Sequence, residues 1–379
     1  MTEPASLTDF RRELHAHPEI AGQEKSTAER LKRFISPFKP DDIIENIGGS
    51  GIAFIFKGKG DGKKILFRAD LDALPIKEIS ELEYRSVYSD RAHLCGHDGH
   101  MTILAGLARE LHKDRPLKGE IILLFQPSEE TGEGAAMVLD DQRFTSAVRP
   151  DYVFALHNLP GFPARSVIIN NSIFSSASVG LTVCLHGKSS HAAEPSKGNS
   201  PVKALSRIID ALHNIRQKKE EFRDFILGTV VHINLGEKRF GTSPEYGEIS
   251  MTLRAYRDDD MEVLKDKVTD AVKNICREEK IRFESEWKEE FLSLENAPYP
   301  VDIIKKAAKL SGLELVEMDE PFKWSEDFSH FTRNYEGAMF GLGAGKDQPA
   351  LHNPDYDFPD EIIDPGINMF LNICNLINQ

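Results

Sequence analysis

Five residues of the types that bind transition metals lie in short motifs spread along the chain: Cys95, His97, Glu130, His157 and His352. Only one glycine separates Cys95 from His97, so the backbone can turn both side chains toward one point. Zinc-like ions accept this mixture of sulfur, nitrogen and oxygen donors. A single structural zinc takes four protein ligands, so five candidates from separate segments better suit two ions, with the thiolate as a plausible bridge.

Glu129 directly precedes Glu130, at the end of an apolar run. Two ions about 3.5–4 Å apart can activate one water molecule and polarise one carbonyl oxygen. A carboxylate beside that water is the expected general base, and it later gives its proton to the leaving amine. These residue types predict metal-assisted hydrolysis of an amide bond, with Glu129 as the base.

The elements that must position these residues are buried strands. Apolar runs predict strands at residues 51–56, 64–70, 119–126 and 152–157. The last three end beside Asp70 and Asp72, the Glu129–Glu130 pair, and His157. In open α/β sheets, ligands bind outside the carboxyl ends of the strands. The pattern predicts an α/β, three-layer catalytic domain with the metal site at that edge of its sheet.

The middle of the chain has a different pattern. Strands are expected at 178–186, 225–235, 248–256 and 281–291, and helices at 199–216 and 258–280. This βαββαβ order predicts a ferredoxin-like domain inserted into the first one. The catalytic domain is therefore expected to consist of two segments, residues 1–175 and 293–379, with the inserted domain at 176–292 between them.

The bulk composition narrows the class of partner and the compartment. The 379 residues carry a formal net charge of −14, which argues against nucleic acid or an anionic membrane as the main partner. The N-terminal stretch lacks the basic and apolar regions of a secretory signal. The four cysteines lie far apart, as free thiols of a cytoplasmic protein would. We therefore expect a cytoplasmic protein with a small-molecule substrate.

Together these motifs resemble the M20 metallopeptidase family, and more narrowly its D subfamily of N-acyl-amino-acid amidohydrolases. The members of that subfamily include hippurate hydrolases, N-acetyldiaminopimelate deacetylases and auxin-conjugate hydrolases. The matching strings stand in family order at residues 68–75, 95–100, 126–130, 156–158, 187–195, 325–328 and 351–354. The resemblance implies two divalent ions (zinc, manganese, nickel or cobalt) on the five residues above, with Glu129 as base.

The resemblance also implies that the inserted domain is a lid or dimerisation domain, and it assigns roles to residues within it. It implies that His191 contacts the substrate carbonyl, that Arg254 binds the substrate carboxylate, and that the protein is a homodimer whose lids present His191 to the partner's site. The substrate would be an N-acyl amino acid, such as an N-acetyl or N-benzoyl one, or a short peptide. One departure is visible: relatives usually carry Asn in an Asn-x-Ile-Pro stretch, where this chain has Gly241-Thr-Ser-Pro. Thr242 or Ser243 could replace that amide.

Three alternatives remain open on the sequence alone. The enzyme could be a dipeptidase or carboxypeptidase-type peptidase of the same family. The chain could be a catalytically silent, metal-dependent binding dimer, although Glu129 and all five ligand candidates are present. Cys95 could be a redox-sensing thiol, although no second cysteine lies near it in sequence. His100 is expected to support the ligands, and Asp70 could be either a supporting residue or a weak ligand.

Overall fold

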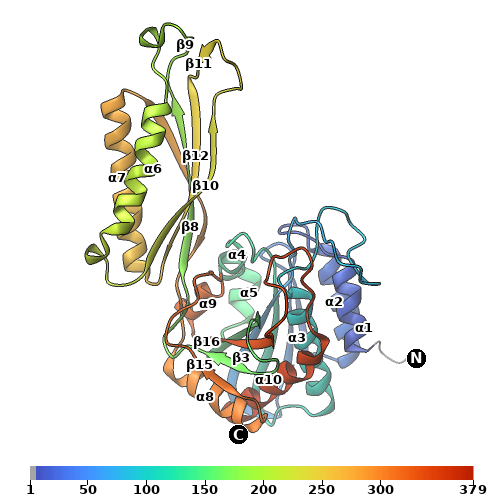
Figure 1. Ribbon diagram of the computed structural model, residues 1–379. Coiled ribbons are helices and arrows are strands. Elements are labelled where there is room, and N and C mark those ends of the chain that lie inside the picture. The colour runs from blue at the N-terminus through green and yellow to red at the C-terminus, as the bar shows by residue number, and fades with distance from the viewer. Residues whose placement is uncertain (1–5, 379) are drawn as a thin grey trace. The chain divides into compact units, whose positions relative to one another are not determined.

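The computed structural model describes residues 6–378 and divides the chain into two units (Figure 1). The first unit comprises the residues up to Phe174, then Leu294–Glu320, and everything from Asp327 onward; the second comprises Ser175–Ser293 and Pro321–Glu326. Met1–Ala5, within the stretch in which the sequence shows no secretory signal, lie outside the described residues.

The first unit is built on one sheet of eight strands, in the order β1-β2-β4-β3-β5-β16-β6-β15. These strands are β1 (Asp42–Ile47), β2 (Gly51–Lys57), β3 (Gly60–Asp70), β4 (Lys118–Gln126), β5 (Tyr152–Pro160), β6 (Val167–Ile169), β15 (Leu315–Glu317) and β16 (Glu336–Gly345). A separate two-stranded pair joins β7 (Ile173–Ser175) to β14 (Leu294–Glu295). The neighbours β4, β3, β5 and β16 run parallel, so their carboxyl ends share one edge of the sheet.

Helices cover both faces of this sheet. On β3, Ile65, Phe67 and Ala69 point into a core cluster built largely from α1 (Leu7–Ala16), α2 (Lys25–Ile35), α3 (His97–Lys113), α8 (Pro298–Leu310) and α10 (Ile363–Ile377). The alternate residue Arg68 faces the other way and pairs with Asp327, near α4 (Gly134–Asp140), α5 (Gln142–Ala147) and α9 (Ser329–Asn334). The structure thereby confirms the predicted mixed α/β class.

The second unit is an antiparallel sheet of four strands, in the order β10-β12-β8-β13, with α6 and α7 side by side along it (Figure 1). Its elements are β8 (Ala177–His186), β9 (Ser190–His191), α6 (Val202–Gln217), β10 (Ile226–Leu235), β11 (Thr242–Ser243), β12 (Tyr246–Ala255), α7 (Asp258–Glu279) and β13 (Arg282–Phe291). Every second residue of β8, from Ala177 to Leu185, packs into a core with apolar residues of both helices.

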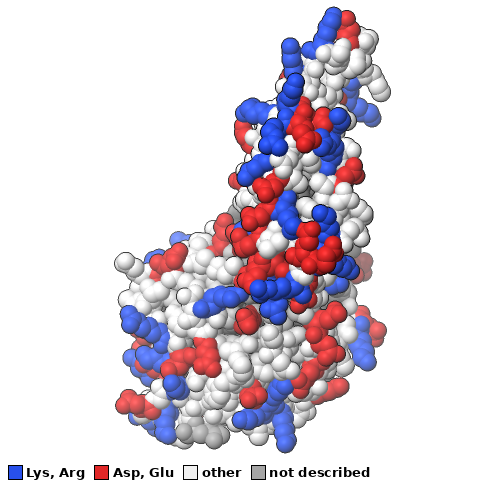
Figure 2. Space-filling model, turned by 90° about the vertical axis from the view of Figure 1, so that its left-hand side faces the viewer, with Lys and Arg blue, Asp and Glu red and all other residues white. Residues whose placement is uncertain are grey.

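Two further observations concern the surface and the membrane. On the face of the molecule in Figure 2, acidic and basic side chains are interspersed. Among residues 6–378, no helix combines the length and the apolar composition that a membrane crossing requires.

Candidate metal centre

The carboxyl ends of three parallel strands bring the predicted ligands together. Asp70 ends β3 and is paired in register with Gln126, the last residue of β4, so the Glu129–Glu130 turn follows at the same edge. Two positions before Asp70, Arg68 pairs with Ala155 of β5, which places His157 at the level of Asp70. The sheet thus gathers residues that are far apart in the chain.

Cys95 and His97 enter the site on either side of Gly96, which caps α3 with a φ of +96°. That left-handed conformation favours glycine. A Cβ at this position would also lie 2.4 Å from Oδ1 of Asn158, a fully buried residue. Helix α3 begins at His97, so this ligand candidate belongs to the first helical turn rather than to the preceding loop.

Short distances between the candidate ligand atoms define the cluster. The Sγ of Cys95 lies 3.5 Å from Nε2 of His157 and 3.3 Å from Nε2 of His352. Oε1 of Glu130 lies 3.6 Å from Nε2 of His352 and 3.8 Å from Nε2 of His97. Ligand atoms of Cys95, His97 and His157 form one group within 4.8 Å, and those of Cys95, Glu130 and His352 form a second. The two groups share the thiol.

The hydrogen bonds of the imidazoles suit metal binding. Nδ1 of His97 lies 2.8 Å from the Asp72 carbonyl oxygen, and Nδ1 of His157 lies 2.9 Å from that of Asn158. A carbonyl oxygen only accepts, so each Nδ1 carries the proton and each Nε2 presents its lone pair. Nε2 of His97 is buried and has no hydrogen-bond partner among the described residues. A divalent ion would satisfy it.

Burial keeps these imidazoles neutral. It lowers the pKa of His97 to about 3, and the same cause depresses the pKa of His157 well below its ordinary value. Burial also lowers the pKa of His352, whose side chain is 48% exposed. Neutral imidazole is the form that binds a metal ion, so the donor set fits such an ion at neutral pH.

His352 reaches the cluster from the last segment of the chain. Its backbone has a φ of +66°, and its N–H donates to the carbonyl oxygen of Leu94, the residue before Cys95. This bond ties the loop after β16 directly to the loop that carries the thiol. The ligand candidates from residues 95 and 352 are therefore held side by side by the backbone itself.

Asp70 and His100, one expected as a supporting residue or weak ligand and the other as a supporting residue, are hydrogen-bonded to protein groups. Asp70 accepts hydrogen bonds from Nη1 of Arg68 and from Nδ1 of His100, each at 2.7 Å. Nε2 of His100 lies at hydrogen-bond distance from Oδ1 of Asn158. Both side chains are buried, and together with His97 they also form a group that could hold a metal ion.

Asp72 holds the turn that carries the predicted base. Its two carboxylate oxygens accept the backbone N–H groups of Glu129 at 3.0 Å and Glu130 at 2.9 Å. Burial raises the pKa of Asp72 to about 8, although these N–H groups favour its charged form. Oε2 of Glu129 lies 3.9 Å from Nε2 of His97, so the side chain reaches the cluster.

A buried charge network beside α3 was not foreseen. Asp98, the neighbour of His97, accepts from Nη1 of Arg11 at 3.2 Å and from Nδ1 of His15 at 2.9 Å. The other imidazole nitrogen of His15 lies 3.4 Å from Glu78. The sequence does offer one signal for this network, the four-residue spacing of Arg11 and His15, which places both side chains on one face of α1.

The second unit carries the two remaining predicted site residues. His191 in β9 is exposed and pairs in register with Thr242 of β11, within the stretch that departs from the family pattern. Its Nδ1 accepts the N–H of Ala193, which leaves Nε2 as the protonated nitrogen of the neutral ring. Arg254 in β12 uses Nη1 to bind the carbonyl oxygen of Lys323 and Oγ of Ser325. Neither residue is one of the grouped metal-ligand candidates.

The eight-stranded α/β unit and its cluster of thiol, imidazole and carboxylate groups define a metal-binding hydrolase. The model of peptidase family M20/M25/M40 matches residues 66–375, and the chain belongs to this family. It is thus a hydrolase that acts on amide bonds, and the predicted resemblance to the M20 family is confirmed.

Relatives and solved structures match over nearly the whole chain. It is 28% identical to an N-acetyldiaminopimelate deacetylase of Geobacillus sp. (strain WCH70), over 98% of both chains. It is 29% identical to a hippurate hydrolase of Campylobacter jejuni, over 93% of this chain and 92% of the relative. The structure of Bacillus subtilis YxeP, a dinuclear metal-binding peptidase of the M20 family, superposes with a TM-score of 0.82 at 23% identity, covering 98% of this chain and 97% of the other.

Proposed function

We propose that this protein hydrolyses the amide bond of N-acylated amino acids, with two divalent ions held by Cys95, His97, Glu130, His157 and His352. The observation that carries the proposal is the pair of ligand groups that meet at the Cys95 thiol. Each group offers three donor atoms, and a shared thiolate is a suitable bridge for two ions. The relatives named as a deacetylase and a hippurate hydrolase support the N-acyl class of substrate.

The bound ions would supply Lewis-acid activation of a water molecule and of the scissile carbonyl group. Glu129 then takes the proton of the attacking water and delivers it to the leaving nitrogen. Its backbone is fixed by Asp72, and its carboxylate lies 3.9 Å from Nε2 of His97, so it stands beside the ligand atoms. Glu130, held by the other oxygen of Asp72, serves as a ligand, and the two adjacent glutamates divide the roles of base and ligand.

His191 and Arg254 complete the proposal for substrate binding. His191 presents a neutral ring with the proton on Nε2, which suits donation to the oxyanion of a tetrahedral intermediate. Nη2 and Nε of Arg254 have no hydrogen-bond partner among the described residues, and a guanidinium fork binds a carboxylate in a bidentate manner. We propose that the protein is a homodimer in which each second unit presents His191 to the partner subunit.

The test of the base compares Glu129→Gln with Glu133→Gln, an exposed glutamate four residues further on. We expect Glu129→Gln to keep its metal by elemental analysis and to lose at least about 10²-fold in kcat on N-acetyl and N-benzoyl amino acids. Glu133→Gln should match the wild type. A Glu129→Gln enzyme with wild-type kcat would exclude the base, and a clear preference for free dipeptides would exclude the N-acyl substrate.

The dimer is tested by mixing two inactive proteins, His191→Ala and Glu129→Gln, under conditions that exchange subunits. If His191 acts on the partner's site, a mixed dimer contains one site with both faults and one with neither, and activity returns. If mass measurement confirms subunit exchange and no activity returns, the assignment of His191 to the partner's site is wrong.

A further inference from the structure

The turn that carries Glu129 and Glu130 has an unfavourable backbone at its first step. Ser128 has a φ of +55°, in the left-handed region that residues other than glycine rarely adopt. This residue is 5% exposed, so its conformation is fixed by buried protein groups. Asp72 accounts for the two N–H groups that follow, but the N–H of Ser128 itself points to another carboxylate.

That carboxylate belongs to Glu24, whose side chain is completely buried. Oε1 of Glu24 accepts the backbone N–H of Ser128 at 2.9 Å, the hydroxyl of Ser128 at 3.3 Å and the N–H of Gly22 at 2.9 Å. Oε2 accepts the hydroxyl of Ser50 at 2.6 Å. One carboxylate thus joins three segments: the loop before α2, the turn between β1 and β2, and the turn after β4.

The side chain of Glu24 does not cap α2, the helix that it precedes. It occupies the N-cap position of α2, yet its side chain makes no capping hydrogen bond there. Glu19 performs that task instead, because its carboxylate accepts both the N–H and the hydroxyl of Thr27. Both glutamates stand in the loop between α1 and α2, and only Glu24 reaches the turn of the predicted base.

We propose that Glu24 is a positioning residue for the hydrolytic reaction: by holding Ser128, it fixes the direction in which Glu129 and Glu130 leave the end of β4. This inference rests on the proposed function. Removal of the carboxylate would leave the buried N–H of Ser128 without its acceptor, and the turn would relax from its left-handed conformation. A displacement of about 1 Å at a reacting group can cost about 10²-fold in rate.

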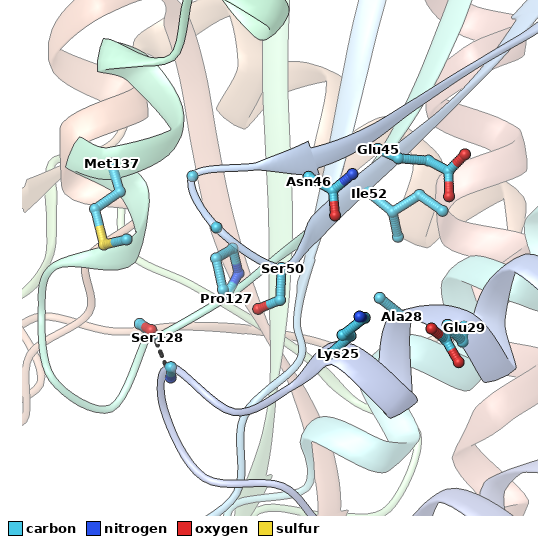
Figure 3. A pocket seen from close by; sticks show the side chains of 13 residues that line it. Lys25, Ala28, Glu29, Glu45, Asn46, Ser50, Ile52, Pro127, Ser128 and Met137 are labelled. Atoms are coloured by element: carbon cyan, nitrogen blue, oxygen red, sulfur yellow. Dashed lines mark hydrogen bonds between the residues drawn. The ribbon is translucent and has the colours of Figure 1, made fainter.

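The surroundings of Glu24 allow a chemical test. Its three partners Gly22, Ser50 and Ser128 line a cavity of about 420 Å³, together with exposed residues such as Lys25 and Glu45 (Figure 3). The dashed line in Figure 3 is the hydrogen bond from the N–H of Gly22 to Oγ of Ser128. The cavity opens at the surface, so in Glu24→Ala a small carboxylate such as acetate can reach the hydrogen-bond donors of Gly22, Ser50 and Ser128 that Glu24 binds in the wild type.

The experiment compares Glu24→Ala and Glu24→Gln with Glu19→Ala as the matched control and Glu129→Gln as the reference. We expect Glu24→Ala to lower kcat by about 10²-fold and to change KM by less than about threefold. Acetate should then raise the kcat of this variant by at least about tenfold. Glu24→Gln retains an amide oxygen for the N–H groups of Ser128 and Gly22, so it should stay within about fivefold of the wild type. Glu19→Ala should keep its kcat and show no response to acetate.

A readout independent of turnover is the visible absorption of the Co²⁺-loaded protein, which reports ligand geometry. Displacement of Glu130 in Glu24→Ala should change the position and intensity of the Co²⁺ bands, and acetate should return them; Glu19→Ala should show the wild-type spectrum. If Glu24→Ala does not fold, Glu24→Asp replaces it, since a side chain one methylene shorter cannot reach Ser128 and Ser50 together, and the same loss of kcat is expected.

The outcomes separate the two proposals. If Glu129→Gln is inactive while Glu24→Ala, or Glu24→Asp in its place, matches Glu19→Ala in kcat and in Co²⁺ spectrum, the positioning role of Glu24 is overturned and the proposed function stands. If Glu129→Gln retains wild-type kcat, the proposed base is excluded, and the inference about Glu24 fails with it.

Discussion

Gly96→Ala should weaken metal binding without altering any proposed ligand. Gly96 has a φ of +96° and lies between Cys95 and His97. An alanine there bears the cost of a left-handed backbone, about 1–2 kcal/mol. Its Cβ would also lie 2.4 Å from Oδ1 and 2.6 Å from Nδ2 of Asn158, and forcing that buried side chain aside adds about 1–3 kcal/mol. The expected total loss of unfolding free energy is about 2–5 kcal/mol.

Gly161→Ala is the matched control for this substitution. Gly161 has a φ of +85°, and a Cβ added to it meets nothing within 4 Å. Gly161→Ala should therefore show only the backbone cost of about 1–2 kcal/mol, and it should bind metal like the wild type. The difference between the two variants isolates the collision with Asn158.

Denaturant unfolding in the presence of chelator measures the stability, and competition with a chelating dye measures the affinity for Zn²⁺. Both tryptophans, Trp287 and Trp324, lie in the second unit, so their fluorescence follows that unit and far-UV circular dichroism must follow the first. We expect about a tenfold or greater loss of Zn²⁺ affinity in Gly96→Ala, because its two neighbours are proposed ligands. A Gly96→Ala protein no less stable than Gly161→Ala, with wild-type affinity for Zn²⁺, would refute the reasoning.

Three further predictions follow from the site. Cys95→Ser should lose metal during dialysis against chelator, because a hydroxyl stays protonated where a thiol ionises onto a metal; a full complement by elemental analysis would exclude Cys95 as a ligand. Burial opposes protonation of His15, but its hydrogen bonds to Asp98 and Glu78 outweigh burial and raise its pKa to about 9 from 6.5. Protonated His15 therefore contributes about 3 kcal/mol to the free energy of unfolding below pH ~6.5, and this contribution is lost as the pH rises toward 9. His15→Gln should flatten the decline of stability over that pH interval, and an unchanged slope in denaturant unfolding would contradict the prediction. Arg254→Ala should reduce kcat/KM on an N-acyl amino acid far more than on its primary-amide analogue, and equal losses on both would mean that Arg254 does not bind the carboxylate.

The positions of the ligand candidates follow from patterns that the sequence displays openly. Apolar runs that end at Asp70, at Gln126 shortly before Glu129, and at His157 predict strands whose carboxyl ends meet, and the register of β3, β4 and β5 places those ends together. The short spacing of Cys95 and His97 predicts two donors at one point because a single glycine turn separates them. Such positions can be predicted from the sequence because each depends on one helix or strand and on where it ends.

The supporting groups could not be predicted in the same way. Glu24 lies in a loop that has no hydrophobic periodicity, and its partners lie up to 104 residues away in the chain. No local sequence pattern therefore predicts its burial. Arg11 lies in an amphipathic helix whose polar residues are expected at the surface, yet its side chain is fully buried among three carboxylates. Only the tertiary arrangement supplies the opposite charges that make such burial tolerable.

The strand order of the first unit has a consequence for biosynthesis. β16 lies between β5 and β6, although the whole second unit except Pro321–Glu326 is synthesised between β6 and β15. At a translation rate of about 5–20 residues per second, roughly 9–35 s pass between the completion of β6 and the completion of β16. During that interval the edge of β5 that later pairs with β16 has no neighbouring strand, and an exposed strand edge can pair with another chain. The proposed metal centre is therefore completed last, and the greatest risk of aggregation falls before the final segment of the chain leaves the ribosome.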